Sequence, residues 1–211
     1  WYGFHPYTTW STTGPENAMR DLSDVNVNRV DIDVVAVMRP YMVRHGAGPF
    51  PTESERLTRV LQDETNSTGN WQGPFRVGHF DPLAAKYALD SIEHVSGIHV
   101  DRLAFTNCDR LVGLPGFKSC TSYTGPDGRV HGLPLPTHGN LEAQQQLGDE
   151  MMRSTPSYRP VPTRDRAEVE QFIDHLSLGV FGKPVTLRTW GPALTDDATW
   201  TIPAPPEPIV V

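Results

Sequence analysis

Two groups of side chains have the types and spacing needed to hold a nucleotide. One is a run of hydroxyls near the start of the chain, and the other is a carboxylate, Asp109, that follows an apolar run. Hydroxyls and backbone N–H groups bind phosphate or sugar oxygens, although a polar turn has the same composition. A carboxylate accepts two hydrogen bonds from the N1 and N2 edge of guanine, which adenine does not present, but it also caps turns. The hydroxyl run comprises Thr8, Thr9, Ser11, Thr12 and Thr13.

A third candidate feature is the stretch from Arg44 to Glu53, Arg-His-Gly-Ala-Gly-Pro-Phe-Pro-Thr-Glu. Its glycines and prolines exclude a helix interior or a central strand. Gly46 and Gly48 permit positive φ or a close approach of the backbone to a ligand, while the prolines stiffen the loop. On composition alone, the stretch also fits an ordinary rigid surface loop.

These residues are set between alternating strands and helices, which predicts the α/β class. The clearest helix begins at the Asp81 cap and ends at Gly97. Val100 to Phe105 is typical of a buried strand, and open α/β sheets bind ligands at the carboxyl ends of such strands. Further helices are predicted over 53–63, 141–152 and 166–178, and further strands over 117–123, 129–135 and 183–188.

Several boundaries follow from turn and cap signals. The segment 30–43 is predicted to be buried; it begins as a strand and then fits either a strand or a helix broken near Pro40. Thr52 is a candidate cap for the helix over 53–63, and Gly179 follows the helix over 166–178. Residues 1–28 are predicted to be loop, and 203–211 an extended or disordered tail.

Composition limits the classes of function. The chain has 211 residues, enough for one large domain or two small ones. Its net charge of −7 argues against sequence-independent nucleic-acid binding, which needs a basic face. Cys108 and Cys120 give neither a disulfide framework nor a zinc spacing, and indicate reduced thiols in a cytoplasmic protein. No apolar run reaches membrane-spanning length, so we expect no membrane partner.

The Arg44–Glu53 stretch resembles the R-x-G-x-GPFPTE signature of adenylosuccinate synthetases. The resemblance covers residues 2–192, is strongest over 42–123, and corresponds to the carboxyl-terminal half of that fold. It implies an α/β, P-loop NTPase-related fold over 1–211, with a mixed sheet and flanking helices. The sequence has no counterpart of the amino-terminal half, where the family keeps its phosphate loop, magnesium ligand and catalytic residues. Because the chain also begins without methionine, we expect it to be part of a longer protein or to act with a partner chain.

By this resemblance, two loops bind guanine. Residues 106–109 match the family's Thr-Lys-Leu-Asp motif at its first and last positions, and Asn107 replaces the lysine. Residues 189–192 match its Ser-x-Gly-Pro loop, without the acidic residue and arginine that usually follow. The implied GTP-binding residues are Asn107, Cys108, Asp109, Thr189, Trp190 and Gly191.

A third loop, residues 6–9, resembles the Tyr-Pro-Tyr-Val-Thr segment that binds inosine monophosphate (IMP), which makes Thr9 the phosphate-side hydroxyl. A fourth, residues 66–81, resembles the loop that closes over L-aspartate. Asn70, also assigned to the IMP site, and Phe75 stand where the family has arginines, which pair with carboxylates in a way that these residues cannot. The implied amino-acid loop residues are Asn66, Ser67, Thr68, Gly69, Asn70 and Arg76, and no metal-binding residue is expected.

The family's reaction is a ligation in which GTP phosphorylates the 6-oxygen of IMP and the amine of aspartate then displaces phosphate. The resemblance therefore implies GTP and Mg²⁺ as cofactors, a purine nucleotide and L-aspartate or a variant amine as substrates, and a cytoplasmic homodimer. We expect this segment alone to bind weakly and not to turn over. Two alternatives stay open: a catalytically incomplete nucleotide-binding or regulatory partner subunit, and an unrelated α/β binding protein.

Overall fold

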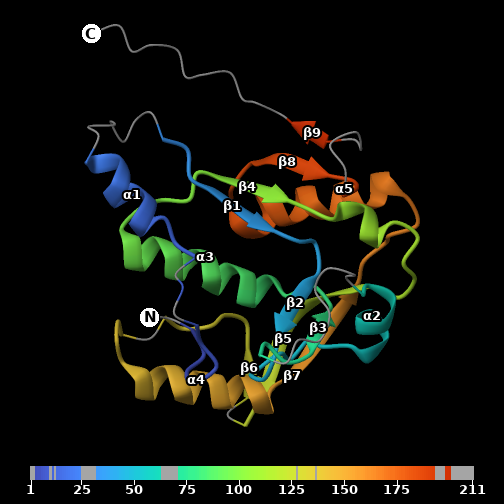
Figure 1. Ribbon diagram of the computed structural model, residues 1–211. Helices are drawn as coiled ribbons and strands as arrows, with labels where there is room; N and C mark the ends of the chain where they lie inside the picture. Colours follow the sequence, from blue (N-terminus) through green and yellow to red (C-terminus); the bar gives the residue numbers. More distant parts are fainter. Residues whose placement is uncertain are drawn as a thin grey trace, which may run out of the picture.

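The sheet that carries the candidate guanine loops has three parallel strands. The computed structural model describes residues 3–9, 11, 13–24, 32–62, 71–126, 128–135, 137–192 and 198–200. β1 (Val35–Met38), β4 (Arg102–Phe105) and β8 (Val185–Thr189) run parallel in that order, and β9 (Ala198–Trp200) pairs antiparallel with β8. Their carboxyl ends therefore lie at one edge, toward which the three arrowheads point in Figure 1.

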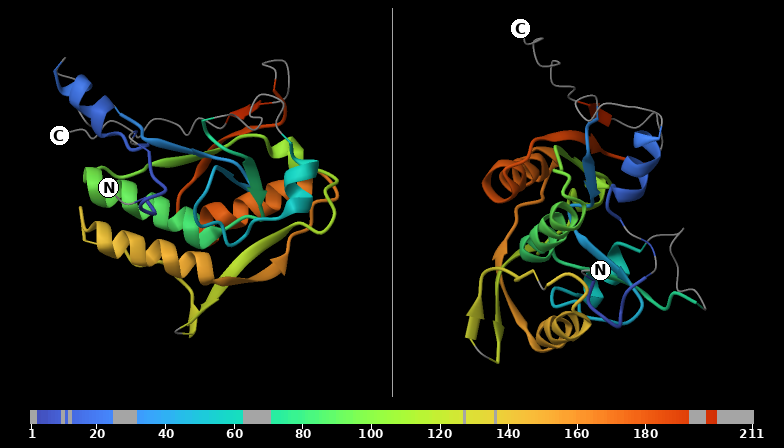
Figure 2. Two further views of the ribbon diagram at one scale, coloured as in Figure 1. Left: turned by 60° about the horizontal axis from the view of Figure 1, so that its bottom comes forward. Right: turned by 90° about the vertical axis from the view of Figure 1, so that its left-hand side faces the viewer.

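Two helices lie side by side on one face of this sheet (Figure 2). α3 (Pro82–Ser96) begins where the Asp81 side chain accepts a hydrogen bond from the N–H of Ala84, and it ends at Gly97, whose φ is 65°. α5 (Arg166–Asp174) begins at the Asp165 cap. It continues directly into a π-helix, η3 (His175–Phe181), which ends at Gly182.

Smaller elements surround this layer. β2 (Met42–His45) and β3 (Phe75–Gly78) form an antiparallel pair next to α2 (Glu55–Val60), and η2 (Cys108–Leu111) follows β4. A second antiparallel sheet is formed by β6 (Gly128–Val130), β5 (Lys118–Gly125) and β7 (Thr155–Pro160), in that order. The remaining helices are α1 (Glu16–Ser23) and α4 (Leu141–Arg153).

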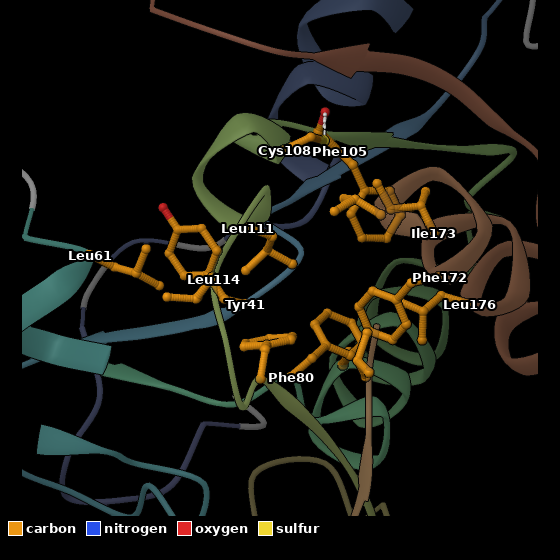
Figure 3. Packing of buried hydrophobic residues seen from close by; sticks show 14 of the residues in the cluster. Tyr41, Leu61, Phe80, Phe105, Cys108, Leu111, Leu114, Phe172, Ile173 and Leu176 are labelled. Atoms are coloured by element: carbon orange, nitrogen blue, oxygen red, sulfur yellow. Dashed lines mark hydrogen bonds between the residues drawn. The ribbon is translucent and has the colours of Figure 1, made fainter. Parts of the chain in front are cut away.

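Apolar side chains from the sheet, α5 and the ends of β3 and η2 form one buried core (Figure 3). The ring of Phe80 meets Phe172 edge-on, with centroids 5.7 Å apart, and lies 6.5 Å from that of Phe105. Leu111 and Ile173 are fully buried in the same cluster. Because η2 packs into this core immediately after β4, the turn that carries Asp109 is held against a rigid support.

The structure confirms the predicted elements over 81–96, 100–105, 117–123, 141–152 and 183–188, with small shifts of their ends. The hydrophobic pattern over 30–43 corresponds to two strands, β1 and β2. The residue that caps α2 is Ser54, whose hydroxyl accepts the N–H of Leu57; the candidate Thr52 was wrong. Gly179 lies inside the π-helix instead of after it, α1 occupies part of the predicted loop, and β7 was not predicted. The tail over 203–211 lies outside the described residues.

β1 is less covered than a parallel strand usually is. Among the described residues it pairs only with β4, and the side chains of Val35 and Val37 are 39% and 67% exposed. Carbonyls of residues 34 and 38 accept hydrogen bonds from Arg102 and Thr106, so the backbone groups of the alternate residues, Val35 and Val37, point to the open edge. The prediction that this segment is buried was therefore wrong for these two valines. No helix in the described part of the chain is long and apolar enough to cross a membrane.

Candidate functional site

The two loops assigned to guanine lie together at the carboxyl ends of β4 and β8. The backbone N–H of Asn107 donates to the Thr189 hydroxyl at 3.3 Å, which joins the loops directly. Asn107 has φ 59°, a left-handed conformation that asparagine tolerates better than most residues. This conformation lets the chain turn from β4 into η2. It thereby positions Asp109, two residues further along the chain.

The Asp109 carboxylate is half-buried at this edge. It has no ion pair or side-chain hydrogen bond with any residue that the structure describes. Next to it Cys108 is fully buried, and burial raises the pKa of its thiol to about 12, so this cysteine stays protonated and packs as an apolar residue. Of the two side chains, only the carboxylate is available to a ligand as an acceptor.

On the β8 side, the guanidinium of Arg166 covers the Trp190 ring, with its Cζ 4.4 Å from the ring centroid. The indole Nε1 of Trp190 and the Nε of Arg188 are buried and have no hydrogen-bond partner among the described residues, while another nitrogen of Arg188 pairs with Asp174. Buried donors of this kind usually have a partner. At this edge Asp109 therefore offers an acceptor to a ligand, whereas the donors of Trp190 and Arg188 are buried beneath the surface.

The segment that contains Thr9 lies against the Arg44–Glu53 loop. Arg44 donates one hydrogen bond to the carbonyl of Tyr7 at 3.2 Å and another to that of Ala47 at 3.0 Å. A Cβ at Gly48 would come within 2.8 Å of the Tyr7 Cβ, so a glycine is required for this contact. Burial, together with the positive charge of Arg76, lowers the pKa of Arg44. Thr9, two residues after this contact, is exposed.

Arg76 links the signature loop to β3. Its Nε and one terminal nitrogen donate to the two carboxylate oxygens of Glu53, and its other terminal nitrogen donates to the carbonyls of Gly46 and Gly48 at 2.8 and 3.1 Å. The other members of the predicted amino-acid loop, Asn66 to Asn70, lie outside the described residues. Arg110 of η2 donates a hydrogen bond to the carbonyl of Gln62 at 2.9 Å, which connects the end of the described segment 32–62 to the turn that carries Asp109.

Three contacts that position the site were not predicted. They are the Arg166–Trp190 stack, the Arg188–Asp174 ion pair and the link from Arg44 to Tyr7. Each joins residues far apart in the chain, and their types alone give no signal of the pairing. Among the described residues, no group of three His, Cys, Asp or Glu side chains could hold a metal ion.

Comparison with known proteins gives one consistent family. The model of the family described as adenylosuccinate synthetase matches residues 1–168. The chain is 28% identical to the adenylosuccinate synthetase of Thermomicrobium roseum over 202 residues, which cover 91% of this chain and 43% of that protein. It is 37% identical to the enzyme of Limosilactobacillus reuteri over 126 residues.

The fold is also similar to a solved structure. Fully ligated adenylosuccinate synthetase from Plasmodium falciparum superposes with a TM-score of 0.68 at 18% identity, covering 95% of this chain and 46% of that one. The chain therefore spans less than half the length of these relatives.

Proposed function

The chain belongs to the adenylosuccinate synthetase family, and from that premise we propose that it is the nucleotide-recognising half of a GTP-dependent ligase. The proposed reaction joins L-aspartate or a variant amine to the 6-position of IMP or a related purine nucleotide, through a 6-phosphoryl intermediate. This half supplies recognition of the guanine base, part of the nucleotide site and the amine loop. The phosphate loop and the catalytic groups belong to the other half of the family's fold.

The observation that carries this proposal is the guanine edge. Two loops distant in the chain are joined by the hydrogen bond from Asn107 to Thr189, and the neighbouring Asp109 carboxylate has no partner among the described residues. A carboxylate accepts hydrogen bonds from guanine N1 and N2, while adenine presents an acceptor at N1 and no donor at C2. The site should therefore select GTP over ATP.

Magnesium would support the phosphoryl transfer by neutralising charge on the phosphates. The described residues contain no group of ligands that fits a metal ion, so we assign none of them to magnesium. What the residues of this chain do in the reaction is to bind and orient the base and the amine.

We also infer that the remaining half of the fold attaches at β1. Both faces of a parallel sheet are usually covered by helices, and most of its strands are paired on both sides. Here α3 and α5 share one face (Figure 2). Val35 and Val37 are exposed, and their backbone groups point to the open edge. A parallel strand with its own covering helix would pair with this edge and bury both valines.

Nucleotide selectivity tests the proposal. A fluorescent guanine nucleotide bound to the complete protein should be displaced by GTP, and ATP at about a hundredfold higher concentration should not displace it. Equal displacement by GTP and ATP would contradict the role given to Asp109.

The alternative is a catalytically incomplete nucleotide-binding or regulatory partner subunit. It makes the same prediction for binding but a different one for turnover. Under this alternative, GTP binds selectively and no GDP forms, whatever nucleotide, amine or companion half is added.

A further inference from the structure

A cavity outside the candidate nucleotide site has the size of a ligand-binding pocket. It is lined by residues of α3, η3, β5, β7 and the segment 131–133, and its volume is about 360 Å³. Pockets that bind small molecules usually have volumes of roughly 300 to 1,000 Å³. None of the described residues assigned to guanine, IMP or the amine lines it. The cavity is therefore separate from the site described above.

Most of the cavity wall is apolar and belongs to regular elements. Leu83 and Tyr87 of α3 are both buried, and Val180 of η3 and Leu133 complete this part of the lining. The Tyr87 ring is held in place by the ring of Phe4, which stacks on it with centroids 5.8 Å apart and an interplanar angle of 12°. An apolar ligand would thus meet a preformed surface.

The polar groups of the lining carry more positive than negative charge. Lys86 and Asp90 form an ion pair at 2.8 Å, so their charges offset each other. Arg159 of β7 is half-buried, and its side chain has no ion pair or hydrogen bond with any described residue. The side chains of His131 and His175 also have no hydrogen-bond partner in the described part of the chain. One guanidinium charge is therefore left over in the cavity, although the chain as a whole has a net charge of −7.

The surplus charge and the apolar wall together indicate the chemistry of a ligand. A guanidinium matches a carboxylate with two parallel N–H···O bonds, and the carboxylate brings the single negative charge that Arg159 lacks. A phosphate monoester brings nearly two negative charges, which one guanidinium does not neutralise. The apolar wall stabilises a ligand whose remaining surface is apolar, because both surfaces leave water on binding.

We propose that this cavity binds an organic carboxylate with an apolar body. The carboxylate pairs with Arg159, and the imidazole N–H groups of His131 and His175 are further donors in the same lining. The apolar body packs on the α3 and η3 side chains. The inference concerns a second binding site, so it does not depend on the proposed ligase function.

The probe 2-naphthoate tests the site, because it joins one carboxylate to a rigid apolar ring system. Calorimetric titration of the complete protein should show one naphthoate bound per chain, with the same affinity in the presence and absence of excess GTP. The uncharged counterpart 2-naphthylmethanol lacks the carboxylate, and acetate lacks the rings. Each should bind at least about tenfold more weakly than naphthoate.

Two pairs of variants locate the probe. Thr121→Glu and Thr121→Gln change an exposed residue of the lining to side chains of nearly equal size, of which only Glu adds a negative charge. Thr121→Glu should weaken naphthoate binding by at least about tenfold, and Thr121→Gln by less than about threefold. Arg159→Gln should also weaken it by at least about tenfold. Arg153→Gln, at an arginine of α4 outside the lining, is the control and should not change it.

Three results would overturn the inference. They are equal binding of naphthoate and naphthylmethanol, equal affinity of the two Thr121 variants, and the absence of naphthoate binding at about 1 mM. Displacement of naphthoate by GTP would place the probe in the nucleotide site and would overturn it as well. If Arg159→Gln does not fold, the Thr121 pair still decides, because it changes only an exposed position.

Discussion

In the proposed function, Asp109 is the residue on which nucleotide choice depends. Asn107 turns the chain with a positive φ, Cys108 anchors the turn in the core, and the carboxylate then lies at the sheet edge without a partner among the described residues. Sequence reasoning found Asp109 from its place after an apolar strand. It could not find Arg166, because a cation that stacks on Trp190 from the start of another helix leaves no local signal.

The Asp109→Asn variant should exchange guanine for xanthine specificity. Asparagine still accepts a hydrogen bond from N1–H, but its amide donates to the 2-oxygen of xanthine and opposes the 2-amino group of guanine. We expect the ratio of GTP to XTP affinity to fall by about a hundredfold in a competition assay. Asp90→Asn, which removes a carboxylate from a surface ion pair with Lys86, is the control and should leave the ratio unchanged. An unchanged ratio in Asp109→Asn would exclude contact with the base.

His79 should make stability depend on pH. Burial, with the nearby charges of Lys118 and Arg56, lowers the pKa of His79 to about 4. The unfolded imidazole titrates near 6.5, so between these values the unfolded state binds more protons, and the free energy of unfolding falls as the pH is lowered. The stability is unaffected above about pH 6.5, and we expect a loss of roughly 2 kcal/mol by the time the pH has fallen to about 4.

Denaturant unfolding measured between about pH 5 and pH 7 checks this expectation. In the wild type, His79 Nδ1 accepts a hydrogen bond from the backbone N–H of Lys118 at 3.1 Å. The His79→Asn variant keeps an acceptor for this N–H but has no imidazole to titrate. The variant should lose less stability than the wild type as the pH falls. The same pH dependence in both proteins would show that His79 is not the group responsible.

At the scale of elements, α3 was the easiest to predict and β7 the hardest. Asp81, Pro82 and Gly97 mark the ends of α3 with local chemistry that needs no tertiary contact. β7 has no alternating pattern, since two prolines lie within it, and it is a strand because β5 pairs with it. Likewise, α5 was predicted to end near Gly179, but the chain continues as a π-helix to Phe181. For β7, strand pairing, which sequence periodicity does not report, decided the conformation.

The Asp81 cap is also a tertiary link, and its loss should be costly. The Asp81 carboxylate accepts the Tyr123 hydroxyl of β5, and both side chains are buried. Burial raises the pKa of Asp81, and the hydrogen bonds from Tyr123, Ala84 and Leu83 oppose this rise. Tyr123→Phe removes one of those donors and should lower the free energy of unfolding by about 2 kcal/mol in urea denaturation. Tyr7→Phe, at an exposed tyrosine, should change it by less than about 0.5 kcal/mol, and an equal effect would contradict the role of this link.

At the scale of the whole molecule, no described strand pairs with the outer edge of β1, and the chain spans less than half the length of its relatives. Signature loops such as Arg44–Glu53 made the family recognisable from sequence, because their glycines and prolines meet local backbone requirements. The bare face of β1 could not be predicted, since Val35 and Val37 have the same pattern as a buried strand.

Val37→Lys tests this edge as the place where the other half attaches. The side chain is 67% exposed, so the substitution should change the stability of the chain by less than about 0.5 kcal/mol. It should weaken association with the separately produced other half by at least about tenfold, because a charge would be buried at the junction. Val60→Lys on α2 should leave association intact, and the measurement is a titration of one half with the other. Equal affinity of Val37→Lys and the wild type would place the junction elsewhere.

The central claim is that this chain recognises nucleotides for a GTP-dependent ligation, and the most direct test is GDP formation by the complete protein. With GTP and Mg²⁺, we predict GDP only when IMP or a related purine nucleotide is present, and loss of this activity in Asp109→Ala at limiting GTP. Selective GTP binding with no nucleotide-dependent GDP formation would contradict the ligase account and favour a regulatory subunit.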